Sequence, residues 1–231
     1  NAPTHFTIVI PARNEAANIK ACVDSILAQD YPTEFFEVIV IDDFSEDTTP
    51  DIVKEMGLSH SNIHLLSLAD YFKSDEMNSF KKKAIEIGIK NSKGDLIIST
   101  DADCIVPPNW LHYLVSFYEK EQYKFIAAPV NFHKENSLFE KFQSLDFIGM
   151  MGVTGAGIYG RFMNMCNGAN LAYEKRAFYA VEGFNGIDKI ASGDDMLLLQ
   201  KMAKHFPNQV GFLKNKIPPV LTNAKPNLKS F

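Results

Sequence analysis

The sequence contains few cysteines, and their positions exclude two common kinds of cysteine site. Cys22, Cys104 and Cys166 are the only three, and they stand far apart with no Cys-x-x-Cys pair. Structural zinc sites and small disulfide-stabilised folds need more cysteines at closer spacing. The pattern therefore favours free thiols in a reducing compartment, which we expect to be the cytoplasm.

A long apolar run is also absent. None reaches the ~18 residues that span a bilayer as a helix. The nearest candidate, residues 147–159, is shorter and contains several glycines. We expect it to pack in the core, as methionine and aromatic side chains commonly do; an amphipathic membrane contact is the alternative. No signal-peptide pattern opens the chain, but Asn1 is not a start methionine. Flanking membrane segments in a longer protein could then hold it at the cytoplasmic face of a membrane.

Excess positive charge is the third absence. The 231 residues carry a formal net charge of -5, and the lysine run at residues 81–83 lies inside a helical pattern. Binding to nucleic acid needs clustered basic side chains, so we expect no nucleic-acid partner. The chain is 46% hydrophobic and 22% charged, which is typical of a soluble globular protein. Without repeats, low-complexity segments or linkers, it favours one domain over residues 1–231.

Short apolar runs alternate with amphipathic segments along most of the chain. The runs predict strands at residues 6–11, 36–41, 63–67, 96–99, 125–130 and 209–212. Helices are expected at residues 14–27, 48–56, 81–91, 107–120, 138–151 and 196–205 and from residue 175, with a glycine-rich loop at residues 152–160. The alternation indicates a parallel α/β sheet, and such sheets bind ligands at the carboxyl ends of their strands.

Polar segments follow three of these predicted strands. They are Pro11-Ala12-Arg13, Asp42-Asp43 and Asp101-Ala102-Asp103. Side chains at positions i and i+2 of an extended chain point to the same side, so the last pair of carboxylates can converge. Two convergent carboxylates attract a hard divalent cation of the Mg²⁺ type. A solvated turn is the alternative, because Asp is common where strands end.

Six segments in order resemble family-2 inverting glycosyltransferases with the GT-A fold, from about residue 6 to residue 202. They are residues 8–15, residues 40–45, Lys81 with Ala84 and Gly88, Asp101-Ala102-Asp103, residues 167–170 and Gly193-Asp194-Asp195. The resemblance implies an α/β fold with a Rossmann-like, mostly parallel central sheet flanked by helices and a smaller acceptor-side subregion. It divides the domain into a nucleotide-binding half, to about residue 130, and an acceptor-side half.

The resemblance also implies which residues bind the nucleotide sugar. The expected set is Pro11, Ala12, Arg13, Glu15, Asp42, Asp43, Lys81, Asp101 and Ala102. Asp43, or less favourably Asp42, accepts a hydrogen bond from the uracil N–H, a role that suits an acceptor-only carboxylate. The alternatives are that Asp42 and Asp43 cap the turn before Thr48, and that Lys81 belongs to a solvated helix face.

Metal and catalytic roles follow in the same way. Asp103 is expected to bind Mg²⁺ or Mn²⁺ with help from Asp101, because such a cation stabilises the leaving diphosphate. Asp195, preceded by Asp194, is the expected general base of a single displacement with inversion. N-capping and interaction with the helix dipole are the alternatives for this pair. Gly168 and Asn170 are expected to line the donor-sugar and acceptor region, unless their segment is only a structural turn.

These residues predict a glycosyltransferase that moves a sugar from a nucleotide donor, expected to be UDP-linked, to a hydroxyl acceptor. The acceptor would be a saccharide or a lipid-linked saccharide, as in the synthesis of cell-envelope polysaccharide. A Gln-x-x-Arg-Trp motif of processive members is absent, so the enzyme is non-processive or the sequence stops before that motif. A catalytically inactive binding module of the same fold and a sugar-phosphate nucleotidylyltransferase remain alternatives. The latter needs a glycine-rich loop after the first strand, which this chain lacks.

Overall fold

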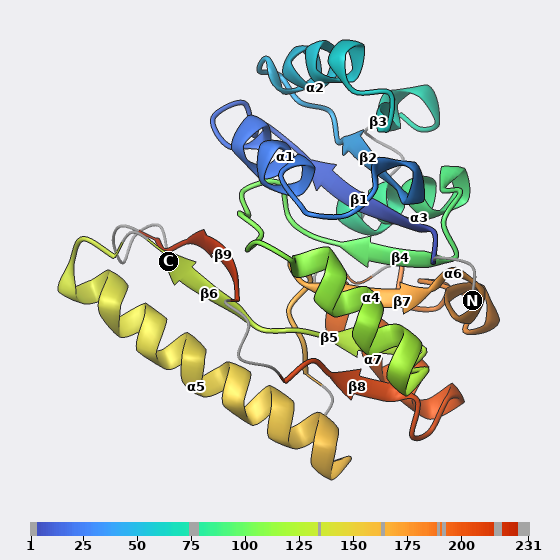
Figure 1. Ribbon diagram of the computed structural model, residues 1–231, viewed down its shortest axis with the longest axis vertical. Helices are drawn as coiled ribbons and strands as arrows, with labels where there is room; N and C mark the ends of the chain where they lie inside the picture. Colours follow the sequence, from blue (N-terminus) through green and yellow to red (C-terminus); the bar gives the residue numbers. More distant parts are fainter. Residues whose placement is uncertain are drawn as a thin grey trace.

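A seven-stranded sheet forms the centre of the computed structural model, which describes residues 4–73, 79–133, 135–162, 165–188, 190, 193–214 and 219–225 (Figure 1). Its strand order is β3-β2-β1-β4-β7-β5-β8. The strands are β1 (Phe6–Ala12), β2 (Phe36–Asp42), β3 (Ile63–Ser67), β4 (Leu96–Ser99), β5 (Phe125–Ala127), β7 (Leu171–Glu174) and β8 (Val210–Phe212). All neighbours pair in parallel except β7, which runs antiparallel to β4 and β5. The predicted mostly parallel α/β fold is confirmed.

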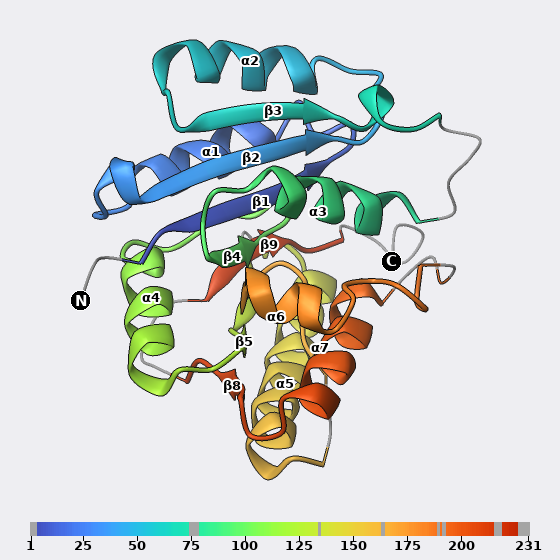
Figure 2. The ribbon, with the colours of Figure 1, turned by 90° about the vertical axis from the view of Figure 1, so that its right-hand side faces the viewer.

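Helices cover both faces of this sheet (Figure 2). They are α1 (Ile19–Leu27), α2 (Thr49–Ser59), α3 (Phe80–Asn91), α4 (Trp110–Glu121), α6 (Lys175–Ala180) and α7 (Asp194–His205), with short 3₁₀ turns η1 (Thr33–Phe35) and η2 (Leu68–Asp70). Successive side chains of β1 enter opposite cores: Ile8 packs with α1, α2 and α4, whereas Val9 packs with α3, α6 and α7. Burial on both faces explains why the central strands are continuous apolar runs.

A second, smaller sheet lies beside the first and carries the longest helix. Its strands β6 (Val130–His133) and β9 (Val220–Asn223) pair in parallel. Helix α5 (Leu138–Gly160) packs against β6 and β8. The predicted strand at residues 125–130 is thus two strands in different sheets. Pro129, which has no N–H to donate, lies between them. Strand β9 was not predicted.

Two predictions for the chain around α5 are wrong. Residues 152–160 are not a loop, because α5 continues through its glycines to Gly160. Residues 147–159 do not form a core segment either: Met150 and Tyr159 are 41% and 76% exposed. Packing against β6 and β8 covers only one side of this helix, and the other side faces outward. Helix α1 also begins later than predicted, at Ile19, since the preceding residues form a hydrogen-bonded loop.

Candidate active site

The loop after β1 is fixed to the loop after β2 by side chains of the second loop. Ser45 Oγ and Thr49 Oγ1 accept hydrogen bonds from the backbone N–H groups of Asn14 and Glu15, at 3.0 and 2.8 Å. The Asn14 side chain returns a bond, accepting from the N–H of Glu46 at 2.8 Å. Asn14 has a positive φ of 56°, which asparagine tolerates better than most residues. These bonds hold the predicted nucleotide-binding loop against the segment that carries Asp42 and Asp43.

Asp43 presents a buried carboxylate oxygen without a partner. Its side chain is 7% exposed, and its Oδ1 accepts no hydrogen bond from the described residues. Burial raises the pKa of Asp43, with the Arg13 charge opposing this shift and Asp42 adding to it. Asp42 differs, because its Oδ1 accepts from the N–H of Ser45 at 3.3 Å. An unsatisfied buried acceptor costs free energy, and a ligand N–H can satisfy it.

Aromatic and basic side chains stand beside Asp43. The Arg13 guanidinium lies over the ring of Phe80, 5.2 Å from its centroid. Phe44 meets the same ring edge-on, with the centroids 6.0 Å apart. Phe44 has a φ of 54°, an uncommon conformation for a bulky residue that is often found at functional sites. Residues of α3 and of the loops after β1 and β2 therefore meet at one edge of the sheet.

Lys81 and Asp101 form the ion pair at the centre of the site. Their Nζ and Oδ1 atoms are 2.6 Å apart. Burial alone would lower the pKa of Lys81, but the charges of Asp101, Asp194 and Asp195 raise it overall. Lys81 therefore stays a cation. The Lys81 and Asp101 side chains are 41% and 34% exposed, so both are partly solvated while the ion pair joins them.

Asp103 is held by a residue from the far end of the chain. Its Oδ2 accepts a hydrogen bond from Thr222 Oγ1 of β9, at 3.0 Å. Glu15 lies close to this pair of aspartates. Burial raises the pKa of Glu15, a hydrogen bond from the Asn18 side chain lowers it, and the charges of Asp103 and Asp101 raise it further. Nothing in the sequence around Thr222 marked it as a site residue, because only the pairing of β9 with β6 brings it here.

The donor set of this cluster fits a hard divalent cation. Asp101, Asp103 and Glu15 supply carboxylate oxygens, which Mg²⁺ and Mn²⁺ prefer. Within the described ranges, no three His, Cys, Asp or Glu side chains are close enough to hold a metal by themselves. Mg²⁺ commonly binds one or two protein carboxylates and completes its shell with phosphate oxygens and water. Asp103 and Asp101 would hold such an ion.

Asp195 approaches the Lys81 side of the cluster from the start of α7. Its Oδ2 accepts from the N–H of Gly168 at 2.8 Å, and its Oδ1 accepts from the N–H of Met196 at 2.7 Å. A Cβ on Gly168 would lie 3.6 Å from Lys81 Nζ and 3.7 Å from Asp195 Oδ2, so this residue lies between the two side chains. Gly193, with a φ of 74°, is the helix N-cap, so Asp194 does not have the N-cap role that the alternative gave it. Both aspartates lie in the first turn of α7, where the helix dipole favours carboxylates, so the alternative dipole role of Asp195 is compatible with the structure.

Burial raises the pKa of Asp195, and the charge of Asp194 adds to this shift. The Met196 and Gly168 amides and the Lys81 charge act in the opposite direction. A buried carboxylate with a raised pKa is a common property of general bases.

Asn170 requires a correction. Its side chain is 2% exposed, its Oδ1 accepts from Trp110 Nε1 and its Nδ2 donates to the Pro129 carbonyl, each at 2.9 Å. Both ends of the amide are therefore bonded to the protein, which favours a role in positioning the loop over contact with a sugar.

The sequence analysis did not predict the contact between Trp110 and Asn170. It also missed the buried Lys82, whose Nζ donates to the Ile190 carbonyl shortly before Asp194.

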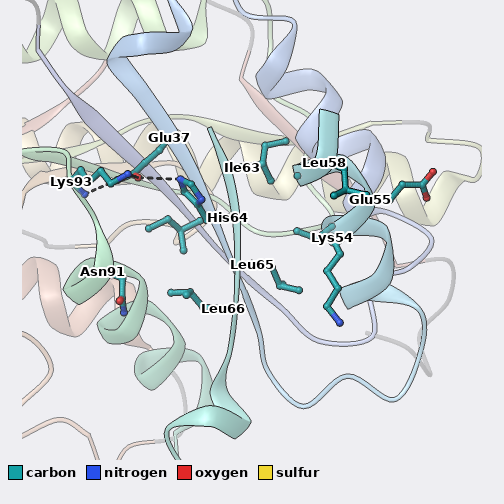
Figure 3. Close-up of a pocket in the computed structure, with 13 residues that line it drawn as sticks. Glu37, Lys54, Glu55, Leu58, Ile63, His64, Leu65, Leu66, Asn91 and Lys93 are labelled. Carbon is teal, nitrogen blue, oxygen red and sulfur yellow. Dashed lines mark hydrogen bonds and ion pairs between the residues drawn. The ribbon is translucent and has the colours of Figure 1, made fainter. Parts of the chain in front are cut away.

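A separate groove of about 850 Å³ lies away from this cluster. Figure 3 shows it beside β3, between α2 and α3. Its most buried charged residue is Glu37, whose carboxylate accepts from Thr7 Oγ1 and from the Lys93 N–H. His64 Nε2 lies 3.6 Å from this carboxylate, and Lys93 Nζ forms an ion pair with it at 3.9 Å. The groove includes none of the predicted site residues, and Glu37 is fully engaged in joining β1 to β2 and β4.

Comparison with known proteins agrees with this geometry. The model of glycosyl transferase family 2 matches residues 7–179. The chain belongs to this family. A curated relative from Methanococcus voltae, dolichyl N-acetyl-alpha-D-glucosaminyl phosphate 3-beta-D-2,3-diacetamido-2,3-dideoxy-beta-D-glucuronosyltransferase, is 30% identical over 115 residues, which are 50% of this chain and 34% of the relative. The chain spans less than half of the first two curated relatives it matches, 45% and 34%.

Two solved family-2-like structures share the GT-A fold. The mannosyltransferase PcManGT from Pyrobaculum calidifontis, in complex with GDP-Man and Mn²⁺, has a TM-score of 0.72 and 21% identity over 100% of this chain and 59% of its own. S. aureus TarS in complex with UDP-GlcNAc has a TM-score of 0.69 and 17% identity over 96% of this chain and 59% of its own. At these identities the likeness shows the fold. The family-2 chain therefore has the GT-A fold.

Proposed function

We propose that this family-2 chain transfers a sugar from a UDP-linked donor to a hydroxyl acceptor by a metal-assisted single displacement with inversion. The observation that carries the proposal is one cluster, in which carboxylates from the loop after β4 and from α7 surround Lys81, while Glu15 of the loop after β1 lies near Asp101 and Asp103. Such an excess of negative charge suits a divalent cation and a diphosphate together. The complexes of PcManGT with Mn²⁺ and of TarS with UDP-GlcNAc support this choice of ligands.

The donor would lie along the carboxyl ends of β1, β2 and β4. Asp43 Oδ1 would accept the base N–H, while Pro11, Ala12 and Arg13 would border the base with Asp42 close by. Lys81 would contact the diphosphate beside Asp101 and Ala102. A bound Mg²⁺ or Mn²⁺, held by Asp103 and Asp101, would supply charge stabilisation to the leaving diphosphate.

Asp195 would accept the proton of the attacking hydroxyl, since each of its oxygens keeps a free lone pair beyond its backbone bond. Direct attack at the anomeric carbon inverts it, and one base is sufficient for this. Asp194 would raise the basicity of Asp195 through its charge. Gly168 would leave room for the donor sugar, and Asn170 would hold its loop. The acceptor half would begin at about residue 131, and the dolichyl relative supports a lipid-linked saccharide as acceptor.

Calorimetric titration tests the donor and the metal. UDP-, GDP- and dTDP-sugars are titrated into the chain with and without about 1 mM Mn²⁺, a concentration that saturates weak carboxylate sites. We expect UDP-sugar binding that strengthens at least tenfold when Mn²⁺ is present. Binding of a GDP- or dTDP-sugar alone would overturn the base assignment. Absence of nucleotide binding with metal would overturn the proposed function.

A further inference from the structure

Helix α5 has an inverted distribution of polar and apolar side chains. The face it packs inward combines the polar residues Glu140, Gln143, Ser144 and Thr154 with Ile158 and the partly buried Phe147. Glu140 closes a capping box with Ser137. Gln143 exchanges two hydrogen bonds with the backbone of Lys225, at 2.8 and 3.2 Å. An ordinary surface helix does the reverse and buries its apolar stripe. These hydrogen bonds and the packing of Phe147 on Phe132 hold α5 on the molecule, while a row of apolar side chains stays outside.

The outward face is apolar along the whole helix. Exposed positions recur every three or four residues, which is the period of one helix face. The large exposed side chains have exposed fractions from 41% (Met150) to 87% (Leu138); they are Leu138, Phe142, Leu145, Ile148, Met150, Val153, Tyr159 and, just after the helix, Phe162. Asp146 is the only exposed acidic residue of α5. Contiguous exposed apolar surface of this kind marks an interaction site.

Basic residues surround this face, although the chain as a whole is acidic. Lys141 and Arg161 lie near the two ends of α5, Lys214 follows β8, and Lys225 is bonded to the inner face; all four are exposed. The chain has a formal net charge of -5. Aromatic residues, Phe142, Tyr159 and Phe162, lie near both ends of the face. Basic and aromatic side chains around an apolar helix face are typical of helices that lie in a membrane interface.

An apolar cavity continues this face toward the sheet. It has a volume of about 640 Å³ and is lined by α5 and β8, including Gly152, Ala156 and Tyr159 of the exposed side, with Lys214 among its lining residues. Hydrocarbon could enter it without meeting a buried unpaired charge. The charges also argue against a second copy of the chain as occupant, because a two-fold pairing through α5 would bring the two sets of cations together.

We propose that the apolar face of α5, with its surrounding cations, docks this chain onto an anionic lipid bilayer. The proposal goes beyond the proposed function and does not depend on it. It also has a consequence for the site: α5 packs on β6, β6 pairs with β9, and Thr222 of β9 binds Asp103. Docking through α5 therefore brings the Asp103 side of the cluster toward the lipid surface. No described helix is long and apolar enough to cross a membrane, so this contact would be interfacial.

Vesicle co-sedimentation of two matched Leu→Glu variants tests the proposal. Leu145→Glu changes the α5 face, whereas Leu58→Glu changes a 90% exposed leucine outside that face, on α2 at the opposite end of the molecule (Figures 1 and 2). Vesicles contain phosphatidylcholine with or without phosphatidylglycerol. We expect the unchanged chain to bind the anionic vesicles, and Leu145→Glu to bind about tenfold more weakly, as the loss of one inserted leucine implies. Leu58→Glu should bind like the unchanged chain, and high salt should weaken all binding.

Three outcomes would overturn the proposal. They are no binding of the unchanged chain to anionic vesicles, equal loss in both variants, and sedimentation of a dimer that Leu145→Glu dissociates. Circular dichroism and thermal unfolding confirm that both variants are folded. Donor titration of Leu145→Glu should match the unchanged chain, so failure of the docking face and failure of the donor site are distinguishable.

Discussion

Asp42 and Asp43 are neighbours in the sequence with different surroundings, and the same substitution should affect them differently. Asp43→Ala removes a buried acceptor that has no partner among the described residues. We expect uridine nucleotide affinity to fall about tenfold or more, as loss of a hydrogen bond to a charged group implies. The melting temperature should not fall, because the folded chain loses no hydrogen bond of that oxygen. Titration with UDP and thermal unfolding measure the two effects.

Asp42→Ala is the matched control for Asp43. It removes the Oδ1 that accepts from the Ser45 N–H, so it should loosen the loop and lower the melting temperature. Its effect on UDP affinity should be smaller than that of Asp43→Ala. The reverse order of affinities would assign the base contact to Asp42, which the sequence left open.

At the residue scale, the acidic positions were predictable and their partners were not. Asp101 and Asp103 follow a buried strand two residues apart, and this local pattern is enough to place them at a sheet edge. The burial of Asn170 depends on Trp110 and Pro129, which are distant in the sequence. Local spacing cannot show which of two amides in the segment at residues 167–170 turns inward.

At the scale of elements, β9 is a short strand with a direct link to the acidic cluster. Thr222→Val keeps the shape of the side chain and removes the hydroxyl that donates to Asp103. Groups that orient a metal ligand typically contribute ten- to a hundredfold to metal affinity. We therefore expect about a tenfold weaker apparent affinity for Mn²⁺ in the presence of UDP, measured by titration of the metal.

Thr222→Ser is the conservative rescue, because it restores the hydroxyl and should recover most of the Mn²⁺ affinity. A merely structural role would lower the melting temperature of Thr222→Val and weaken UDP binding without metal to the same extent. Equal Mn²⁺ affinities of the valine variant and the unchanged chain would contradict the positioning role of Thr222.

Helix α5 shows why the elements of the second half were harder to predict than those of the first. Glycine disfavours helix by about 1 kcal/mol relative to alanine, so the glycines of residues 152–160 favoured a loop. The helix is stabilised by its packing against β6 and β8 and by hydrogen bonds of its buried polar side chains. These contacts join segments that are distant in the sequence. The sequence showed the apolar residues of this helix, but it did not show whether they face the core or the outside, because periodicity alone does not say which side of a helix is covered.

At the scale of the whole molecule, the site joins segments that are far apart in the chain. Lys81, Gly168 and Asp195 meet although they come from α3, from the segment before β7 and from α7. The sequence predicted that the ends of parallel strands converge, and this covered the first half. The position of α7 did not follow from this rule, because it depends on the antiparallel strand β7 between β4 and β5, which was not expected; only the family resemblance assigned Asp195 to the site.

The position of Asp195 predicts how transfer and stability depend on pH. Burial raises the pKa of this group, so transfer should be lost on acidification at a pH above the ordinary range of Asp, ~3.9. A raised folded pKa means that the protonated form favours folding: its contribution is present below the unfolded pKa and is lost as the pH rises through the folded value. Asp195→Asn should keep donor affinity and lower the transfer rate by about a hundredfold or more.

The same variant should also gain stability relative to the unchanged chain as the pH rises, because the amide does not ionise beside Asp194. Transfer rates and melting temperatures measured from acidic to neutral pH test both effects. Asp194→Asn is the control: it removes the neighbouring charge but keeps the Asp195 carboxylate, so its acidic limb should move to lower pH with transfer retained. A fully active Asp195→Asn variant would exclude Asp195 as the base, and an unmoved acidic limb in Asp194→Asn would exclude the coupling of the two carboxylates.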